Sequence, residues 1–468
     1  MFKRAFRYLS AASAISLGVV STPVWAAEPP LPEEIWSSLG AKLTRPNSDN
    51  NQTYIVVGGG PSAYMCVQGL RASGFTGKIL LISPEQHLPY DKAQLGVNLS
   101  ADVTSLLLGT EEFYRDYGVE VLLSTDVDWV NNKDHKLRTK DGKEFSYHKL
   151  CIATDGITMV PTHYTHSLKN LDNFVTIREA HDHEKVVKEL PGAQSIVIVG
   201  ATLKGFEVAA SILKQYPDKQ VYMLDSNDQP LQDEFGNSMA QTIVRQVQSL
   251  GLRSYFGAKF HDLTEESNKV ASVKLQTKNE FKGNIEETLP TDLMILTTES
   301  RNEVEFLPPS LLQSDGLISV DSRMRTVDSN IYAVGDSVSY PNLLSEHRTK
   351  NSYVPVSQLQ ALYAAQNMAG NGHRFLNAPV YSANVGVRVD MAGHYGDHDW
   401  FFSETLKDGP TEEAQEVTYF YKQGRCVGVA VYNNPELLLK LKQKLDSGRM
   451  PSPSQLTSLK TVNVINEE

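Results

Sequence analysis

Two glycine-rich turns, each placed between an apolar run and a helix-like stretch, constrain the fold of this chain more than any other feature. The first turn, GGGPSA at residues 58–63, follows the apolar run 53–57, and the second, GATLKG at residues 200–205, follows the run 195–199. A strand, a glycine-rich turn and a helix in this order are typical of a βαβ unit whose helix N-terminus faces a phosphate group. Strand-like and helix-like segments alternate after both turns, which predicts an α/β protein with two Rossmann-like domains.

The first turn has the small residues that a dinucleotide-binding turn needs. Gly58 permits the tight turn, Gly60 lets the backbone approach a pyrophosphate, and Ala63 allows the helix to pack closely on the strand. Glu85 follows the next apolar strand, 22 residues after Ala63 (85 − 63), where a carboxylate can bind ribose hydroxyls. We therefore expect Gly58, Gly60, Ala63 and Glu85 to bind a dinucleotide.

The second turn lacks its middle glycine. Gly200 and Gly205 are present, and Asp225 follows a further strand, 20 residues after Gly205 (225 − 205). Thr202 occupies the middle position, and its β-branched side chain is expected to keep a pyrophosphate away from the backbone. Two interpretations stay open: a weak dinucleotide site formed by Gly200, Gly205 and Asp225, or a well-packed scaffold that binds no ligand.

Composition and charge exclude several other classes of protein. The chain has 468 residues, of which 41% are hydrophobic, which is enough for two or three domains with sizeable cores. A net charge of −11 and the lack of a clustered basic patch argue against a nucleic-acid surface. Cys66, Cys151 and Cys426 show no C-x-x-C spacing, and no histidine pair has a cysteine or carboxylate at structural-site spacing. We therefore expect buried, structural cysteines and no metal site.

The N-terminal segment has the pattern of a secretory signal peptide. Three basic residues precede the apolar run 9–20, and small residues up to Ala26 offer a cleavage site. An uncleaved membrane anchor is the alternative, but the run is shorter than the ~20 residues that span a bilayer. We predict that residues 1–26 are removed and that the protein is exported to the periplasm or secreted, without stable membrane insertion.

The remaining chain is predicted to form a linker and three domains. Residues 417–421 and 426–432 have the pattern of a β-hairpin followed by a leucine-rich helix, whereas residues 397–415 are expected to form a loop. The expected segments are a linker at 27–52, a discontinuous first domain at 53–157 and 319–396, a second domain at 190–312, and a small α+β domain at 397–468.

Three further motifs carry a resemblance to a known family. They are LPYDK at residues 88–92, IATDG at residues 152–156, and YAVGD, which ends at Asp336. With the first turn, they resemble the FAD-dependent pyridine-nucleotide oxidoreductases of the ferredoxin-reductase type, and the C-terminal segment is similar to that of the apoptosis-inducing-factor group. The resemblance implies that Lys92, Thr154 and Asp336 join the first turn in binding FAD, and that the second turn belongs to an NAD-binding domain.

Several positions depart from the family pattern where its chemistry takes place. Val97 stands where the family has a lysine near the flavin ring, so Glu207, which matches the partner of that lysine, lacks its expected cation. Lys92 replaces an arginine, and residues 353–356 contain no histidine where the family has a histidine-rich stretch. Residues 298–302 replace the family's G-x-x-P-N turn. These departures imply that NAD(P)H binding and hydride transfer are weak or lost, and no catalytic residue is assigned.

Two functions of different classes agree with these motifs. Members of the resembled family transfer hydride from NAD(P)H to FAD and pass electrons onward. The first function is therefore an exported FAD-dependent oxidoreductase with weakened or lost NAD(P)H use, which exchanges electrons with an unidentified partner protein or a quinone-like molecule. The second is a pseudo-oxidoreductase that keeps the fold and acts as a protein-interaction module. A homodimer stays open in both cases.

Overall fold

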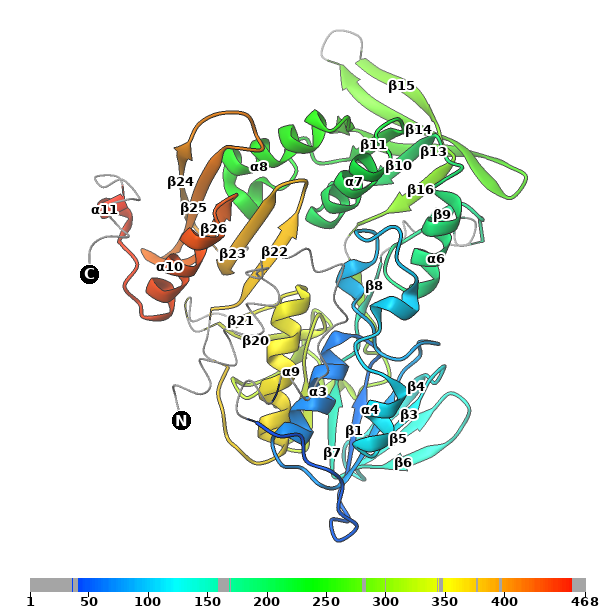
Figure 1. Ribbon diagram of the computed structural model, residues 1–468, viewed down its shortest axis with the longest axis vertical. Helices are drawn as coiled ribbons and strands as arrows, with labels where there is room; N and C mark the ends of the chain where they lie inside the picture. Colours follow the sequence, from blue (N-terminus) through cyan, green and yellow to red (C-terminus); the bar gives the residue numbers. More distant parts are fainter. Residues whose placement is uncertain are drawn as a thin grey trace. The chain divides into compact units, whose positions relative to one another are not determined.

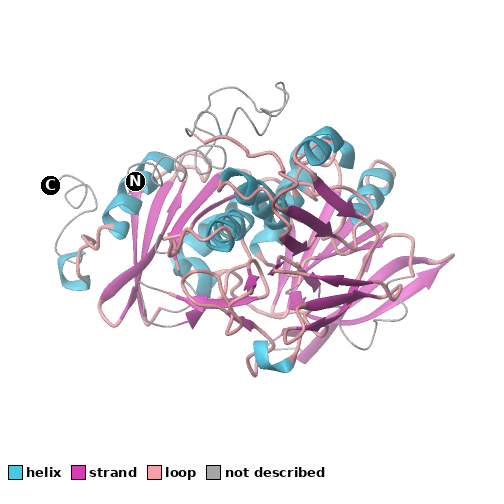
Figure 2. Cartoon of the chain, turned by 90° about the horizontal axis from the view of Figure 1, so that it is seen from below, coloured by secondary structure: helices cyan, strands magenta, loops and turns pink. Residues whose placement is uncertain are grey.

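The computed structural model describes residues 41–158, 170–279, 283–298, 300–342, 348–375, 378–394 and 398–456, together with Trp36, Leu168 and Leu344. The predicted signal peptide lies outside the described residues, and residues 41–52 of the expected linker form neither helix nor strand. The chain divides into two compact units. Residues up to Lys92, 104–157 and 302–381 form the first unit, and residues 93–103, 158–301 and 382 onward form the second. Both units combine helices with sheets (Figure 2), which confirms the predicted α/β class.

A parallel five-stranded sheet forms the centre of the first unit. In the order β19, β7, β1, β2 and β3, its strands are Ile331–Ala333, Lys149–Ile152, Thr53–Val57, Lys78–Ile82 and Val119–Leu122. Val57 at the end of β1 lies opposite Ile82 at the end of β2 and Ile152 at the end of β7. Because the strands are parallel and in this register, their carboxyl ends lie along one edge of the sheet.

Two long helices pack together in the first unit. Helices α3 (Pro61–Ala72) and α9 (Val354–Met368) lie side by side in Figure 1. A Cβ atom on Gly69 of α3 would lie 2.8 Å from the Cβ atom of Ala365 of α9, so small residues permit this close approach. The pairing fixes the direction of α3, whose N-terminus follows the first glycine-rich turn.

Shorter elements complete the first unit and the connections. The first unit also contains α4 (Glu111–Asp116), η3 (Pro309–Leu311), an antiparallel sheet of β4 (Val127–Asn131), β5 (Lys136–Thr139) and β6 (Glu144–Ser146), and the strands β18 (Ile318–Ser319), β20 (Val338–Pro341) and β21 (Arg348–Thr349). Where the chain passes between the units it forms η1 (Lys92–Gln94), η2 (Val103–Leu106), β8 (Gly156–Thr158) and β17 (Ser300–Asn302).

A second parallel sheet, covered by an antiparallel one, forms the first part of the second unit. The parallel order β12, β11, β10, β16 and β9 corresponds to Arg253–Phe256, Gln220–Asp225, Ser195–Val199, Leu293–Leu296 and Phe174–Val175. The antiparallel strands are β13 (Lys259–Glu266), β14 (Lys269–Asn279) and β15 (Gly283–Pro290). Val273 and Leu275 of β14 join Val197 and Leu224 in one buried apolar cluster, so the two sheets share a core.

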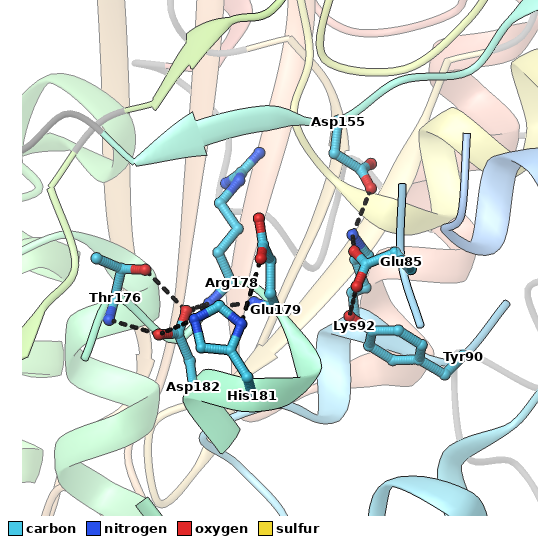
Figure 3. A network of polar contacts seen from close by, with 9 residues as sticks. All are labelled: Glu85, Tyr90, Lys92, Asp155, Thr176, Arg178, Glu179, His181 and Asp182. Atoms are coloured by element: carbon cyan, nitrogen blue, oxygen red, sulfur yellow. Dashed lines mark hydrogen bonds and ion pairs between the residues drawn. The ribbon is translucent and has the colours of Figure 1, made fainter. Parts of the chain in front are cut away.

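Three helices accompany this parallel sheet: α6 (Ala180–Glu189), α7 (Leu203–Gln215) and α8 (Gln232–Ser249). The start of α6 is held by Asp182, whose Oδ2 accepts hydrogen bonds from the Thr176 hydroxyl at 2.8 Å and the Arg178 backbone N–H at 3.0 Å (Figure 3). Asp182 also forms a capping box with Glu179. This network stabilises a helix end and explains its polar residues without a ligand.

Helix α8 is kinked at Gly236, which has φ 75° and ψ 164°. A Cβ atom there would lie 2.8 Å from the ring of Phe401, so both the backbone angle and the space require glycine. After the kink, the Ser238 hydroxyl donates to Glu416 at 3.1 Å and the Thr242 hydroxyl donates to the same carboxylate. These bonds fix the longer part of α8 to the C-terminal sheet of the same unit.

The C-terminal sheet is larger than the sequence predicts. Its order β22, β23, β26, β25 and β24 corresponds to Val380–Asn384, Arg388–Gly393, Arg425–Tyr432, Gln415–Lys422 and Trp400–Lys407, and it is followed by α10 (Pro435–Asp446) and α11 (Pro453–Leu456). The β25–β26 hairpin is confirmed. The boundary expected between residues 396 and 397 is wrong, because β23 pairs with β26. The loop expected at 397–415 is also wrong, since β24 pairs along β25.

Two other predicted boundaries need correction. Residues 93–103 were expected in the first domain, yet Lys204 donates to the Ala93 carbonyl at 3.0 Å within the second unit. Residues 302–312 were expected in the second domain, yet the Phe306 carbonyl accepts from the Val130 N–H at 2.9 Å within the first unit. Both segments belong to the unit in which their backbone carbonyls accept these bonds. In the described ranges, no helix combines the length and apolar character of a membrane span.

Arg71, at the end of α3, is fully buried in the first unit and donates hydrogen bonds to four backbone carbonyl groups. Its guanidinium donates to the carbonyls of Phe75 at 2.6 Å, Gly77 at 2.9 Å, Tyr117 at 2.9 Å and Gly118 at 3.2 Å. Burial lowers the pKa of Arg71 to about 10. The side chain therefore joins the segments that lead into β2 and β3 to the end of α3.

We expect Arg71→Met to lower the free energy of unfolding by about 3 kcal/mol, because methionine fills similar space but leaves four buried carbonyls without their donor. Urea unfolding followed by circular dichroism measures the change. Arg115→Met, at a side chain that is 69% exposed, is the control and should shift stability by less than about 0.5 kcal/mol. Equal stability of the two variants would show that Arg71 does not have this structural role.

Candidate functional site

The first glycine-rich turn adopts the conformation that dinucleotide binding needs. Gly58 has φ +144°, and a Cβ atom there would lie 2.2 Å from the Ala153 carbonyl oxygen, so only glycine fits. Gly60 is the N-cap of α3 and provides no side-chain hydrogen bond to the helix. Ala63 is fully buried, as expected for close helix packing. The N-terminus of α3 therefore keeps N–H groups that no N-cap side chain satisfies, and such a helix end attracts an anion.

Three charged side chains gather beside this turn. Lys92 Nζ lies 2.6 Å from Glu85 Oε1 and 2.9 Å from Asp155 Oδ2, and Figure 3 shows the ammonium group between the two carboxylates. The Tyr90 hydroxyl donates to Glu85 Oε2 at 3.2 Å. A Cβ atom on Gly59 would lie 2.7 Å from Glu85 Cγ, so the acid contacts the turn directly. The predicted residues Glu85 and Lys92 are thus brought together with Asp155, which the sequence analysis did not single out.

Lys92 remains a cation in this cluster. Burial lowers its pKa, but the attraction of Asp155, Tyr90 and Glu85 outweighs burial and raises the pKa above its ordinary value. Its side chain is only 13% exposed. Two carboxylates and one ammonium group leave the cluster with one negative charge.

Thr154 and Asp336 follow neighbouring strands at the same edge of the sheet. Ala333 of β19 lies opposite Ile152 of β7, and both residues come shortly after these strand ends. The buried Thr154 Oγ1 has no hydrogen-bond partner within the described residues. Gly335 has φ +88° and donates its N–H to Gln360 Oε1 at 2.9 Å, while the buried Gln360 Nε2 finds no partner in the part of the chain that the structure describes. Unsatisfied polar atoms at a strand edge fit a ligand with hydrogen-bonding groups.

All the residues that were predicted to bind FAD therefore lie at one edge of the first unit's parallel sheet. They come from the turn after β1, the segments after β2 and β7, and the segment after β19: Gly58, Gly60, Ala63, Glu85, Lys92, Thr154 and Asp336. The carboxyl edge of an open parallel sheet is where such folds bind ligands.

The second turn has the same topology but satisfies its own polar groups. Gly200 has φ +112°, and a Cβ atom on Gly205 would lie 2.4 Å from the Gly200 carbonyl, which explains both glycines. Asp225 Oδ2 accepts a hydrogen bond from the Ala201 N–H at 2.7 Å. The acid that was expected to bind a ribose is thus also bonded to the turn itself.

Thr202 does more than occupy the position of a glycine. It is the N-cap of α7, and its hydroxyl accepts from the Gly205 N–H at 3.2 Å and donates to the Thr297 carbonyl at 2.8 Å. An N-cap hydroxyl satisfies an N–H group that a phosphate would otherwise bind. The sequence predicted crowding at this position, and the structure adds a capped helix N-terminus.

A cavity of about 440 Å³ adjoins the second turn. Its walls include Gly200, Thr202, Asp225, Leu231 and Phe260. Its size lies within the range of small-molecule pockets. Asp225 and Glu234 line it, and none of the described lining residues is basic. The second unit therefore has room for a ligand, but its charge does not favour a phosphate.

Glu207 and the three cysteines, which the sequence analysis also considered, have different surroundings. Glu207 accepts the Asn384 N–H at 2.9 Å instead of the family's lysine, and burial raises its pKa against the opposing charge of Lys204. Cys66 and Cys151 are fully buried, which confirms that prediction, whereas Cys426 is partly buried and burial raises its pKa to about 12.

The described residues contain no group of three or more His, Cys, Asp or Glu side chains that could hold a metal ion. The histidines at 163 and 166, which the sequence analysis weighed as a pair, lie outside the described residues.

Comparison with known proteins gives relatives that align over most of this chain. Apoptosis-inducing factor 3 of Mus musculus is 28% identical over 415 residues, which cover 87% of this chain and 66% of that protein. The chain thus spans slightly less than two thirds of this relative. Putidaredoxin reductase CamA of Pseudomonas putida is 25% identical over 410 residues, which cover 86% of this chain and 93% of that protein.

Solved structures share the fold. Putidaredoxin reductase, in its covalent complex with putidaredoxin, has a TM-score of 0.78 at 24% identity, covering 89% of this chain and 98% of that chain. A ferredoxin reductase from Rhodopseudomonas palustris has a TM-score of 0.76 at 21% identity, covering 89% of this chain and 100% of that chain. The profile of the pyridine nucleotide-disulphide oxidoreductases matches residues 52–369, more than half of the sequence, and the chain belongs to this family.

Proposed function

We propose that the protein is an FAD-dependent oxidoreductase that binds FAD at the carboxyl edge of the first unit's sheet. The observation that carries the proposal is the convergence of the seven predicted residues at that edge, beside the side-chain-free N-cap of α3. The unsatisfied Thr154 Oγ1 and Gln360 Nε2 support it, because a ligand with polar groups would satisfy them. The carboxylate of Asp155, which contacts Gly60 at this N-cap, opposes the binding of a phosphate there.

Different residues of this site suit different parts of the cofactor. Glu85 suits the ribose hydroxyls, the N-terminus of α3 suits the pyrophosphate, and Thr154 and Asp336 suit the flavin-bearing half. In flavoproteins, FAD supplies two-electron acceptance with release of one electron at a time. The contribution of this chain is to bind and orient the cofactor and to exclude water from it.

We further propose that NAD(P)H use is weakened or lost. The Thr202 hydroxyl already caps α7, the Ala201 N–H is bonded to Asp225, and the adjoining cavity has acidic but no basic described residues in its walls. The first two features occupy N–H groups that would bind a pyrophosphate, and the acidic wall disfavours its negative charge. Weak binding of a nicotinamide nucleotide in the cavity remains compatible with these features.

The electron partner that we propose is a small electron-transfer protein. Two relatives are named for their action on such proteins, putidaredoxin reductase and rubredoxin-NAD(+) reductase, both of Pseudomonas putida. A monodehydroascorbate reductase of Arabidopsis thaliana, 24% identical over 483 residues, is named for a small molecule. A quinone-like acceptor is therefore the second candidate, and a homodimer remains compatible with either.

Absorption spectroscopy of the purified protein tests the function. We expect a visible flavin band that anaerobic NADH bleaches slowly or not at all and that dithionite bleaches fully. Asp336→Ala should lower the flavin content about tenfold, as expected for the loss of one charge-assisted hydrogen bond. Asp116→Ala, an exposed acid in the first unit, is the control. A folded protein without a flavin band would instead favour the non-catalytic interaction module, and rapid bleaching by NADH would contradict weakened NAD(P)H use.

Substitution of Thr202 tests the cause of weak nucleotide binding. Thr202→Gly should increase NADH affinity about tenfold, because it frees the Gly205 N–H from the Thr202 hydroxyl. Thr202→Ser keeps the hydroxyl and loses only the methyl group, so its affinity should stay near that of the unchanged protein. Calorimetric titration with NADH measures all three proteins. Equal affinity of all three would place the obstruction elsewhere, and equal gains in both variants would assign it to the methyl group.

Export is also proposed, from the basic and apolar pattern of residues 1–26. Expression in a Gram-negative host should give periplasmic protein whose intact mass corresponds to a chain that starts at Ala27. Replacing the three basic residues of the N-terminal segment with glutamate should reduce the periplasmic fraction. Full-length protein in the cytoplasm would contradict both cleavage and export.

A further inference from the structure

Asp155 occupies the position that an incoming phosphate must approach. A Cβ atom on Gly60 would lie 2.9 Å from Asp155 Oδ2, so this carboxylate is in contact with the N-cap of α3. It is also 2.9 Å from Lys92 Nζ. The side chain is 29% exposed, which leaves it open to solvent and to a ligand.

The carboxylate is well placed to compete with a phosphate. A helix N-terminus carries about half a positive charge and favours a negative group beside it. In this structure that negative group is supplied by the chain itself, through Asp155 at Gly60. A pyrophosphate at the same helix end would meet a like charge at short range, which disfavours its binding.

Asp155 is not required to hold Lys92. Glu85 binds the ammonium group at 2.6 Å, and the Tyr90 ring lies 5.6 Å from Nζ. Removal of Asp155 would therefore leave Lys92 in place while changing the net charge of the cluster from −1 to 0. The lysine would then have a donor free for a phosphate oxygen.

We propose that Asp155 is a specificity-determining residue that weakens FAD retention by competing with the cofactor's pyrophosphate for the N-terminus of α3 and for Lys92. This inference rests on the proposed FAD site. It implies that the chain binds FAD less tightly than the same chain with glycine at residue 155 would.

The test is titration of the flavin-free full chain with FAD and with riboflavin, followed by the quenching of flavin fluorescence. Asp155→Gly should bind FAD at least about tenfold more tightly, which corresponds to about 1.4 kcal/mol. Asp155→Asn removes the charge but keeps the side-chain volume beside Gly60. Its FAD affinity should therefore lie between that of the unchanged protein and that of Asp155→Gly. Asp128→Asn is the matched control, because this acid of the first unit pairs with Arg138 on an exposed surface and should leave FAD affinity unchanged.

Riboflavin separates the phosphate effect from any other effect of the substitution, because it lacks the pyrophosphate. Its affinity should be the same in the unchanged protein and in Asp155→Gly. The ratio of FAD affinities between Asp155→Asn and the unchanged protein should also fall as ionic strength rises, since salt screens an exposed charge.

Three results would overturn the inference. Equal FAD affinity of Asp155→Gly and the unchanged protein would refute it while leaving the proposed FAD site intact. An equal gain for riboflavin would show that Asp155 acts on the flavin half. A lack of FAD binding by every folded variant would contradict both the inference and the proposed function, whereas tighter FAD binding by Asp155→Gly with unchanged riboflavin affinity supports both.

Discussion

The close contact between Gly58 and the Ala153 carbonyl determines the geometry of the first unit's site. Because no side chain fits there, β1 can turn sharply into α3 while β7 runs beside it. This contact points the N-terminus of α3 to the carboxyl edge of the sheet, where the segments after β2, β7 and β19 also arrive. The packing of α3 against α9 and the carbonyl contacts of Arg71 then hold the helix at its other end. Ligand chemistry at the edge depends on this fixed helix.

The two glycine-rich turns show how one local fold can lead to different chemistry. Both follow a central parallel strand, and both begin with a glycine at positive φ. At the first turn the N-cap is Gly60, and negative charge comes from Asp155 of a distant segment. At the second the N-cap is Thr202, which satisfies the helix from within the turn. The Asp155 carboxylate, whose ion pair is with Lys92, can be displaced from the helix end, whereas a hydroxyl bonded on both sides is harder to displace.

Local sequence patterns predicted the parts of the structure that depend on local interactions. The apolar runs and glycine spacings identified both βαβ units, because each βαβ unit needs a buried strand and small residues at fixed positions. The pattern did not reveal β24, which lies at the edge of its sheet. The segments on both sides of it contain acidic residues and glycine, and this composition is typical of a loop. It also missed Asp155, although the acid within IATDG was visible. Its contact with Lys92, 63 residues earlier (155 − 92), depends on the pairing of β1 with β7. The N-cap role of Thr202 had a signal, since threonine is a preferred N-cap residue.

The kink at Gly236 separates helix α8 into two parts that have different contacts. Glu234, before the kink, lines the cavity, whereas Ser238 and Thr242, after it, bind Glu416 of the C-terminal sheet. A straight helix would transmit any displacement of its first turn along its whole length. The break in the hydrogen-bonded helix at Gly236 lets the cavity wall adjust to an occupant while the C-terminal sheet keeps its packing, so the size of the cavity can vary independently of the stability of that sheet.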